Sequence, residues 1–194
     1  MLRAPSDLFG HAPDQRLPPG FKYQPEVIEP GEERELIRSI EQMPLKEFEF
    51  QGFLGKRRVV SFGWRYDFNG GGLRKTEDIP DVVLPARAKA AAFAGLKPEA
   101  LQQVLITEYR PGVQIGWHKD RSVFGEVVGI SLLSHCIFRL RRKLQSGAWE
   151  RVSIDAAPCS AYLLTGPSRT EWEHSIPPVD ALRYSITFRN FKEY

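Results

Sequence analysis

Four histidines occur in the chain, and His118 stands two residues before a carboxylate in the segment GWHKDR. On an extended strand, residues two apart point to the same face, so His118 and Asp120 would project side by side. Two such neighbours and one distant histidine form the donor set of a 2-His-1-carboxylate triad, which holds ferrous iron and leaves positions open for reactants. The spacing therefore marks a candidate iron site, with a chance pair in a surface turn as the alternative.

The distant histidine has two candidates. His174 follows the turn Gly166-Pro167 in TEWEHSIPP, 56 residues after His118, which leaves room for several strands between the two. His135 lies between apolar strand positions in SHC, where a core or edge histidine bonded to the backbone is the expected role. A jelly roll brings an early and a late strand together, and that architecture favours His174.

The segment RYSITFR near the C-terminus carries two cations six residues apart, Arg183 and Arg189. On a strand both would face the same side, together with Ser185 and Thr187. Two buried guanidiniums are costly unless an anion meets them, and a dicarboxylate would accept paired, charge-assisted bonds from arginine. The alternative is a pair of exposed arginines on an edge strand.

These side chains need a scaffold, and the hydrophobic pattern divides the chain into an early helical part and a late strand-rich part. Residues 31–43 place apolar side chains on one helical face, and the Ala-rich segment 86–96 predicts a second helix. From residue 101 onward, short strands alternate with turns at 103–109, 127–133, 136–142, 151–155, 160–166 and 182–190. We expect an α+β fold: a double-stranded β-helix (jelly roll) with two supporting helices.

The region between the two helices alternates with period two. Residues 46–50 and the run VVSFGWRYDF at 59–68 predict strands, and Asn69 opens a Gly-rich turn. Residues 46–75 are therefore expected to form a β-hairpin region in front of the jelly-roll core at 101–191. Residues 1–20, with four prolines, are expected to form an irregular arm in front of a single domain at 21–194.

Composition limits the class of protein. With 194 residues, 42% hydrophobic and 26% charged, the chain is an ordinary globular one. It has no apolar run of about 18 residues and no signal-peptide core, so we expect no membrane span and a cytoplasmic location. Cys136 and Cys159 lie in apolar stretches and are expected to be buried and reduced. Basic side chains concentrate in residues 51–75 and 139–151, which indicates an anionic partner unless they are simply solvated strand faces.

Taken together, EYRPG, the His-X-Asp pair, the distal histidine and RYSITFR resemble the AlkB family of Fe(II)- and 2-oxoglutarate-dependent dioxygenases, over about residues 101–191. The resemblance implies that His118, Asp120 and His174 bind iron. It implies that Arg183 meets the distal carboxylate of 2-oxoglutarate and that Arg189 lies near its keto-acid end. A further set of residues is implied by the resemblance alone or departs from the family pattern. Tyr109 is expected to bond the same co-substrate or to pack on Pro111; Thr107 and Ser185 stand where the founding member has asparagines, and Ser122 stands where it has an acid that helps read the base.

The resemblance also implies a reaction. Fe(II), 2-oxoglutarate and O₂ would oxidise N-alkyl groups on bases of DNA or RNA, releasing succinate, CO₂ and formaldehyde. In the family, the segment before the core forms a lid over the nucleotide, so the resemblance implies an N-terminal β-hairpin lid at residues 46–75. Trp64 and Tyr66 could stack on an extruded base, with Arg65 and Arg141 at phosphates; the alternatives are aromatics in the core and Arg141 at the plain surface. The alternatives are the same chemistry on a protein, a tRNA modification or a small molecule, or a jelly-roll binding module without activity. No protein partner is evident from the sequence.

Overall fold

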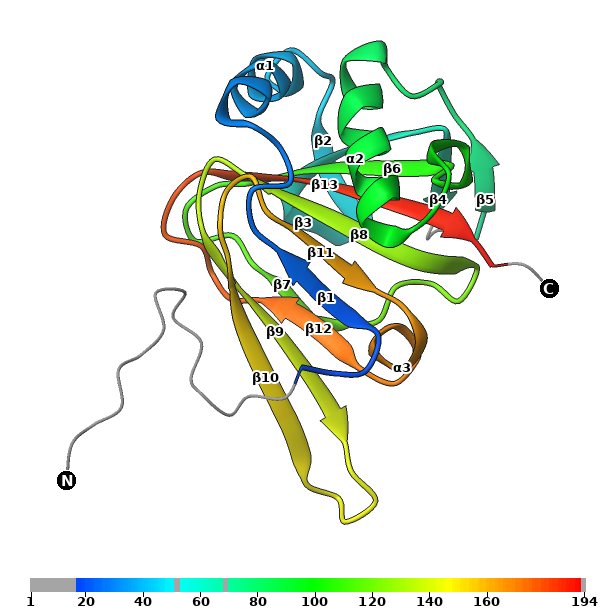
Figure 1. Cartoon of the computed structure of the whole chain (residues 1–194), viewed down its shortest axis with the longest axis vertical. Coiled ribbons are helices and arrows are strands. Elements are labelled where there is room, and N and C mark those ends of the chain that lie inside the picture. The colour runs from blue at the N-terminus through cyan, green and yellow to red at the C-terminus, as the bar shows by residue number, and fades with distance from the viewer. Residues whose placement is uncertain (1–16, 51–52, 68–69, 193–194) are drawn as a thin grey trace.

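Two antiparallel β-sheets stack on each other in the computed structural model, which describes residues 17–50, 53–67 and 70–192 (Figure 1). The larger sheet has the order β1 (Phe21–Gln24), β11 (Ala161–Leu164), β8 (Phe124–Leu132), β13 (Arg183–Phe191), β6 (Gln103–Tyr109), β3 (Phe53–Phe62), β2 (Lys46–Phe50). The smaller has the order β10 (Trp149–Ala156), β9 (Cys136–Lys143), β12 (Glu173–Ile176), β7 (Ile115–His118). This two-sheet arrangement confirms the α+β class.

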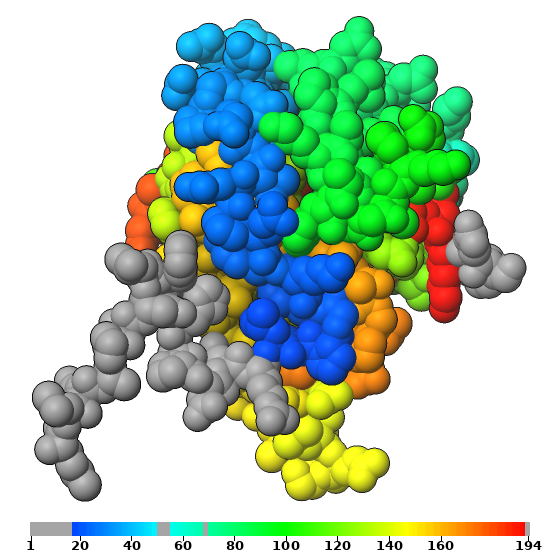
Figure 2. All heavy atoms as spheres, viewed as in Figure 1, coloured from blue at the N-terminus to red at the C-terminus, as the bar shows by residue number. Residues whose placement is uncertain are grey.

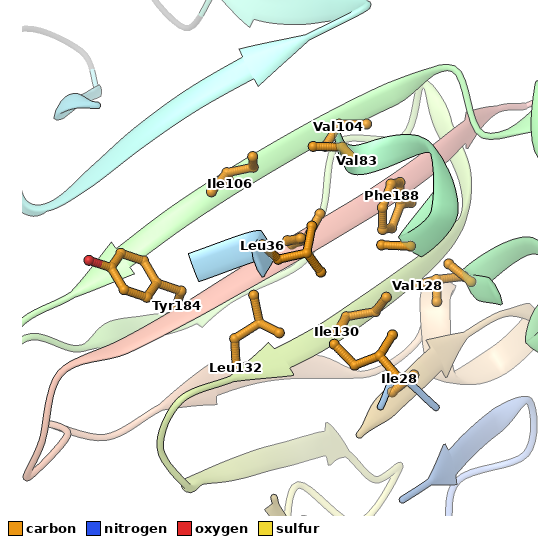
Figure 3. Packing of buried hydrophobic residues seen from close by; sticks show 14 of the residues in the cluster. Ile28, Leu36, Val83, Val104, Ile106, Val128, Ile130, Leu132, Tyr184 and Phe188 are labelled. Atoms are coloured by element: carbon orange, nitrogen blue, oxygen red, sulfur yellow. The ribbon is translucent and has the colours of Figure 1, made fainter. Parts of the chain in front are cut away.

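Helices α1 (Pro30–Ile40) and α2 (Leu84–Ala94) cover the outer face of the larger sheet. Figure 3 shows Leu36 of α1 directed at the side chains of the central strands β6, β8 and β13. The helix pair and this sheet face form one buried apolar cluster, whose sheet members include Val104, Ile106, Val128, Ile130, Leu132, Tyr184, Ile186 and Phe188. Strand alternation therefore sends the remaining side chains of the same strands to the opposite, inner face.

That inner face is polar at the centre and apolar around it. On β13, the inward set is buried and consists of Arg183, Ser185, Thr187 and Arg189. An apolar cluster surrounds this set where the two sheets meet, and the rings of Phe138 and Tyr162 lie 4.3 Å apart in it. Cys136 and Cys159 are buried free thiols, as the sequence predicted.

Three features of the fold differ from the predicted elements. The expected strand 59–68 is broken at Gly63, whose φ of +73° and close approach to the Gln102 carbonyl exclude a side chain there. Strand β3 ends before it, and β4 (Trp64–Asp67) pairs with β5 (Gly72–Lys75) as a separate hairpin. The second difference concerns the expected hairpin region at 46–75. Its strands β2 and β3 extend the larger sheet, because β3 pairs with β6, so only the β4–β5 hairpin is separate from the two sheets. Phe68, Asn69 and residues 1–16 lie outside the described part of the chain.

The third difference is a helix that the periodicity analysis missed. The five-residue helix α3 (Gly166–Thr170) is too short to show a periodic pattern. Its signal was local: Thr165 and Ser168 form a reciprocal capping box, and Pro167 stands in the first turn. The short 3₁₀ turns η1 (Asp81–Val83) and η2 (Pro98–Ala100) precede and follow α2.

The β9–β10 hairpin projects beyond the two sheets and is the yellow segment in Figures 1 and 2. Among the residues that the structure describes, no helix has the length and apolar character needed to cross a bilayer.

The contact of Gly129 with Tyr162 tests the packing between the sheets. A Cβ at Gly129 would lie 2.2 Å from Cζ of the Tyr162 ring, which the neighbouring strand holds in place. We expect Gly129→Ala to lower the free energy of unfolding by about 1–3 kcal/mol, measured by urea denaturation. Gly31→Ala in α1 is the control, since its nearest neighbour is a flexible arginine tip at 3.9 Å and alanine favours helix. Equal stability of the two variants would show that Tyr162 does not restrict this position.

Candidate active site

The two predicted histidines lie directly opposite each other on neighbouring strands of the smaller sheet. β12 pairs with β7 so that His174 stands across from His118, and the ring centroids are 4.2 Å apart. Asp120 follows β7 after one residue, and its Oδ2 lies 3.6 Å from His174 Nε2. His118, Asp120 and His174 therefore lie close together between the two sheets, although His174 is more than 50 residues from the other two in the sequence.

Both imidazoles are neutral near pH 7, and a hydrogen bond sets which nitrogen of His118 carries the proton. His118 Nδ1 lies 2.8 Å from the Gly116 carbonyl, and because a carbonyl only accepts, Nδ1 carries the proton and Nε2 keeps its lone pair. Burial is the main cause that lowers the pKa of His118. Burial, followed by the neighbouring His118, lowers the pKa of His174 to about 3. Both rings are thus neutral near pH 7.

The carboxylate of Asp120 is fixed through one of its two oxygens. Arg189 Nε and Nη2 lie 2.9 and 2.7 Å from Oδ1, while Oδ2 faces His174. Gln103 orients the same guanidinium by accepting a bond from Arg189 Nη1 at 2.8 Å. Burial opposes ionisation of Asp120, but Arg189, followed by the two histidines, outweighs it and holds the pKa of this carboxyl well below its usual range.

Donor types and protonation states fit a ferrous ion, since two neutral imidazoles and one ionised carboxylate are a 2-His-1-carboxylate set. Across the described ranges, no group of three or more His, Cys, Asp or Glu side chains is placed so that it could hold a metal ion as it stands. Asp120 instead interacts with Arg189 and His174. We regard the set as fitting because the donors are adjacent and Asp120 directs its second oxygen toward His174.

Arg183 is buried, but two of its three guanidinium nitrogens have no hydrogen-bond partner, although buried polar groups are normally bonded. Its side chain is 1% exposed, yet Nε and Nη1 have no hydrogen-bond partner. Its remaining bond runs from Nη2 to Ser131 Oγ at 3.2 Å, and the guanidinium lies over the Tyr109 ring at 5.1 Å. Each unsatisfied buried donor costs about 1–3 kcal/mol. A carboxylate beside the guanidinium would reduce this cost, because it accepts charge-assisted hydrogen bonds from arginine N–H groups.

The other expected co-substrate contacts surround Arg183 on the inner face of the larger sheet. Tyr109 on β6 pairs with Arg183 on β13, and Thr107 pairs with Ser185 two positions along. All four side chains are buried. The structure brings them together on one wall, with Arg189 further along the same strand.

The expected substrate contacts are divided among three places. Tyr66 and Trp64 are half-buried on β4, where Arg121 lies over the Tyr66 ring at 4.9 Å and Phe191 meets Trp64 edge-on at 5.4 Å. Trp64 also lines a cavity of about 310 Å³ with Lys75 and Arg87. Arg65 is exposed on the same strand, and Ser122 is exposed in the turn after Asp120.

Two candidates lie away from this group. Arg141 is on the outer face of the smaller sheet, where it pairs with Glu173 at 2.6 Å and contacts the rings of Trp117 and Trp149. His135, the alternative third histidine, is exposed and pairs with Asp155 at 3.0 Å. The structure does not bring either of them to His118.

Sequence reasoning missed three residues of the site. Gln103 orients Arg189, and Arg169 of α3 bonds the loop that carries Asp120. Arg57 lies in a bulge of β3, stacks on Phe48 at 3.9 Å, and is close enough to Asp120 and Tyr109 to interact with them electrostatically. The run Lys56-Arg57-Arg58 was visible as a basic block, but only the bulge decides which of its members turns inward.

Comparison with known proteins places the chain in a family. Residues 26–189 match the model of the 2OG-Fe(II) oxygenase superfamily, and the chain belongs to that superfamily. Within it the chain is of the AlkB type, and it is a dioxygenase whose cofactor and co-substrates are Fe(II), 2-oxoglutarate and O₂.

Two curated relatives carry the AlkB-type similarity. The chain is 29% identical over 184 residues to the mouse (Mus musculus) protein named tRNA (carboxymethyluridine(34)-5-O)-methyltransferase ALKBH8, covering 90% of this chain and 27% of that one. It is 27% identical over 183 residues to the Arabidopsis thaliana protein named Alkylated DNA repair protein ALKBH8 homolog, covering 82% of this chain and 51% of that one. The chain thus spans between about a quarter and a half of these relatives.

Solved structures confirm the double-stranded β-helix. The structure of OsALKBH1 superposes with a TM-score of 0.67 at 16% identity, covering 91% of this chain and 100% of that one. A Pseudomonas putida prolyl-4-hydroxylase superposes with a TM-score of 0.60 at 13% identity, covering 90% and 94%. At these identities the likeness concerns the fold.

The metal assignment predicts that Asp120→Asn lowers Co(II) affinity by more than about 100-fold, beyond the effect typical of an outer-shell residue. Asparagine keeps a partner for Arg189, whereas alanine would leave that cation buried and unpaired. Absorption titration with Co(II) measures the affinity, and circular dichroism checks the fold. Asp155→Ala is the matched control, because it removes a carboxylate from an exposed His–Asp pair. Unchanged Co(II) binding in Asp120→Asn would refute the assignment.

Arg183→Met should act in opposite directions without and with 2-oxoglutarate. Without it, the variant loses two unsatisfied buried donors, so its melting temperature should equal or exceed that of the wild type. With it, we expect the dissociation constant for 2-oxoglutarate to rise about 10- to 100-fold, measured by calorimetry. Arg110→Met, at an exposed neighbouring position that pairs with Glu108, should leave the dissociation constant for 2-oxoglutarate unchanged. Wild-type affinity for 2-oxoglutarate in Arg183→Met would exclude the proposed contact.

Proposed function

We propose that this dioxygenase oxidatively removes alkyl groups from bases in nucleic acid. The observation that carries the proposal is the position of the β4–β5 hairpin beside the metal-ligand candidate. Arg121 directly follows Asp120 and lies over the ring of Tyr66, so an aromatic strand and the Asp120 turn share one edge of the site. An enzyme that acts on an extruded base needs such a ring near its reacting centre.

His118, Asp120 and His174 are proposed to hold the iron. Arg183 would bind the distal carboxylate of 2-oxoglutarate, with Tyr109, Thr107 and Ser185 completing that wall. When bound, iron, 2-oxoglutarate and O₂ supply the oxidising power that hydroxylates an N-methyl carbon, with release of succinate, CO₂ and then formaldehyde. Arg189 keeps Asp120 ionised and turned toward His174 before any substrate arrives. The apolar cluster between the sheets limits water around these groups.

Charge supports a polyanionic substrate. Arg65, Arg74 and Lys75 are exposed on the β4–β5 hairpin, which has one acid, Asp67, among its strand residues. Exposed cations of this kind contact phosphates, while base contacts determine specificity. The proposed binding surface therefore consists of this hairpin and the Asp120 turn, with Ser122 in a position to contact the base.

The names of the relatives agree with a nucleic-acid substrate, since one is called an alkylated DNA repair protein homolog and another a tRNA enzyme. The methyltransferase activity in the mouse protein's name is not carried over, because the chain spans 27% of that protein.

We propose alkylation repair as the role, residues 21–194 as one catalytic domain, and the cytoplasm, where buried thiols stay reduced, as the compartment.

The test is a demethylation assay on paired DNA and RNA oligonucleotides that carry N1-methyladenine, N3-methylcytosine or an etheno adduct. We expect at least one of them to stimulate succinate formation, with formaldehyde (or the dialdehyde from an etheno group) in matching amount. Tyr66→Ala should raise KM for that oligonucleotide about tenfold, consistent with about 1–3 kcal/mol per stacked base. Succinate formation without oligonucleotide is the internal control and should not change. If every oligonucleotide fails while methylated peptides stimulate turnover, the nucleic-acid proposal is wrong.

A further inference from the structure

Helix α3 immediately precedes β12, the strand that carries His174, and one of its side chains, the buried Arg169, bonds to the segment that carries Asp120. Arg169 is 8% exposed and donates four hydrogen bonds to backbone carbonyls. They run from Nε to Gly125 at 2.9 Å, from Nη1 to Asp120 at 3.3 Å, and from Nη2 to Arg121 at 2.6 Å and Phe124 at 2.9 Å. Two of the acceptors, Asp120 and Arg121, lie in the turn that joins β7 to β8, and the other two, Phe124 and Gly125, begin β8.

These bonds fix the turn that carries Asp120. The turn itself has one internal backbone bond, from Phe124 N to the Arg121 carbonyl at 3.1 Å. Arg169 donates to carbonyls on both sides of that bond, and a planar guanidinium can donate to several carbonyls from one rigid group. Since the Asp120 carbonyl is among them, the bonds restrain the backbone of the proposed iron ligand.

The C-terminal end of α3 is followed by β12, which carries His174, the other proposed iron ligand that the helix could position. Four residues separate Arg169 from His174, and Trp172 between them is buried at 1% exposure. Lys119 Nζ donates to the Thr170 carbonyl at 2.9 Å, which adds a second link from the β7 end to α3. The N-terminus of α3 is anchored in turn, because Ser168 N donates to the Pro19 carbonyl at 2.9 Å. The helix is therefore tied to its surroundings on three sides.

We propose that Arg169 is a positioning residue for the metal site: from α3 it sets where Asp120 stands relative to His174. Arg189 orients the carboxylate of Asp120, whereas Arg169 holds its backbone, so the two cations restrain different parts of one residue. The inference rests on the proposed roles of Asp120 and His174 as iron ligands. It assigns Arg169 no contact with iron, 2-oxoglutarate or substrate.

Arg169→Met and Arg169→Lys test the proposal, with Co(II) affinity and the visible spectrum of the Co(II) protein as readouts independent of turnover. We expect both variants to bind Co(II) about 10- to 100-fold more weakly, as is typical when a group behind a metal ligand is lost, and to show an altered ligand-field spectrum. Lysine keeps the charge but cannot make the four bonds, so charge alone should not restore binding. The matched control is Arg142→Met. Arg142 pairs with Glu171 just after α3 but makes none of these bonds, and its loss should leave affinity and spectrum unchanged.

A folded Arg169→Met protein with wild-type Co(II) affinity and spectrum would overturn the inference. If that variant does not fold, Lys119→Met gives the second test, because it removes only the exposed bond to Thr170. It should weaken Co(II) binding about threefold, the effect of one hydrogen bond, and unchanged binding would count against the proposal. Failure of the proposed iron site itself is recognised separately, since the wild-type protein would then bind Co(II) no better than Asp120→Asn.

Discussion

A buried carboxylate and a buried guanidinium meet between the two sheets, and the site is organised around that ion pair. Arg189 and Asp120 are 69 residues apart in the sequence. The cost of removing both charges from water is offset only where the pair has good geometry and further hydrogen bonds. Here Gln103 supports the guanidinium and Arg169 supports the backbone of the aspartate. The result is a carboxylate that stays ionised in a dry place and directs its second oxygen to His174.

The strand β13 shows how the fold makes this possible. One face of it, with Ile186 and Phe188, is packed under the helices, and that apolar burial holds the strand in the centre of the larger sheet. The alternate face then has to turn Arg183 and Arg189 inward, because the period of a strand is two. Arg189 finds its anion within the chain. Arg183 does not, and its unsatisfied donors are what a dicarboxylate co-substrate would complete.

Much of this arrangement could be predicted from local pattern. The strand 103–109 and the helix over the Ala-rich segment were predicted because their periodicity is strong, and the structure has them at those places. The spacing of Arg183 and Arg189 fixed their common face. Gly63 broke a predicted strand because its close approach to Gln102 is a tertiary contact, and Arg57 and Arg169 were missed since a bulge and a five-residue helix decide where they point. The jelly-roll architecture favoured His174 over His135 as the third candidate, and the register of β12 with β7 places His174 opposite His118.

The central claim is that His118, Asp120 and His174 act as one iron site facing Arg183. Crystals grown with Mn(II) and 2-oxoglutarate, with diffraction recorded at the manganese absorption edge, test it most directly. We expect one strong anomalous peak within coordination distance of the two imidazole Nε2 atoms and Asp120 Oδ2, with a carboxylate of the co-substrate on the Arg183 guanidinium. An anomalous peak elsewhere, or a co-substrate bound away from Arg183, would contradict the account.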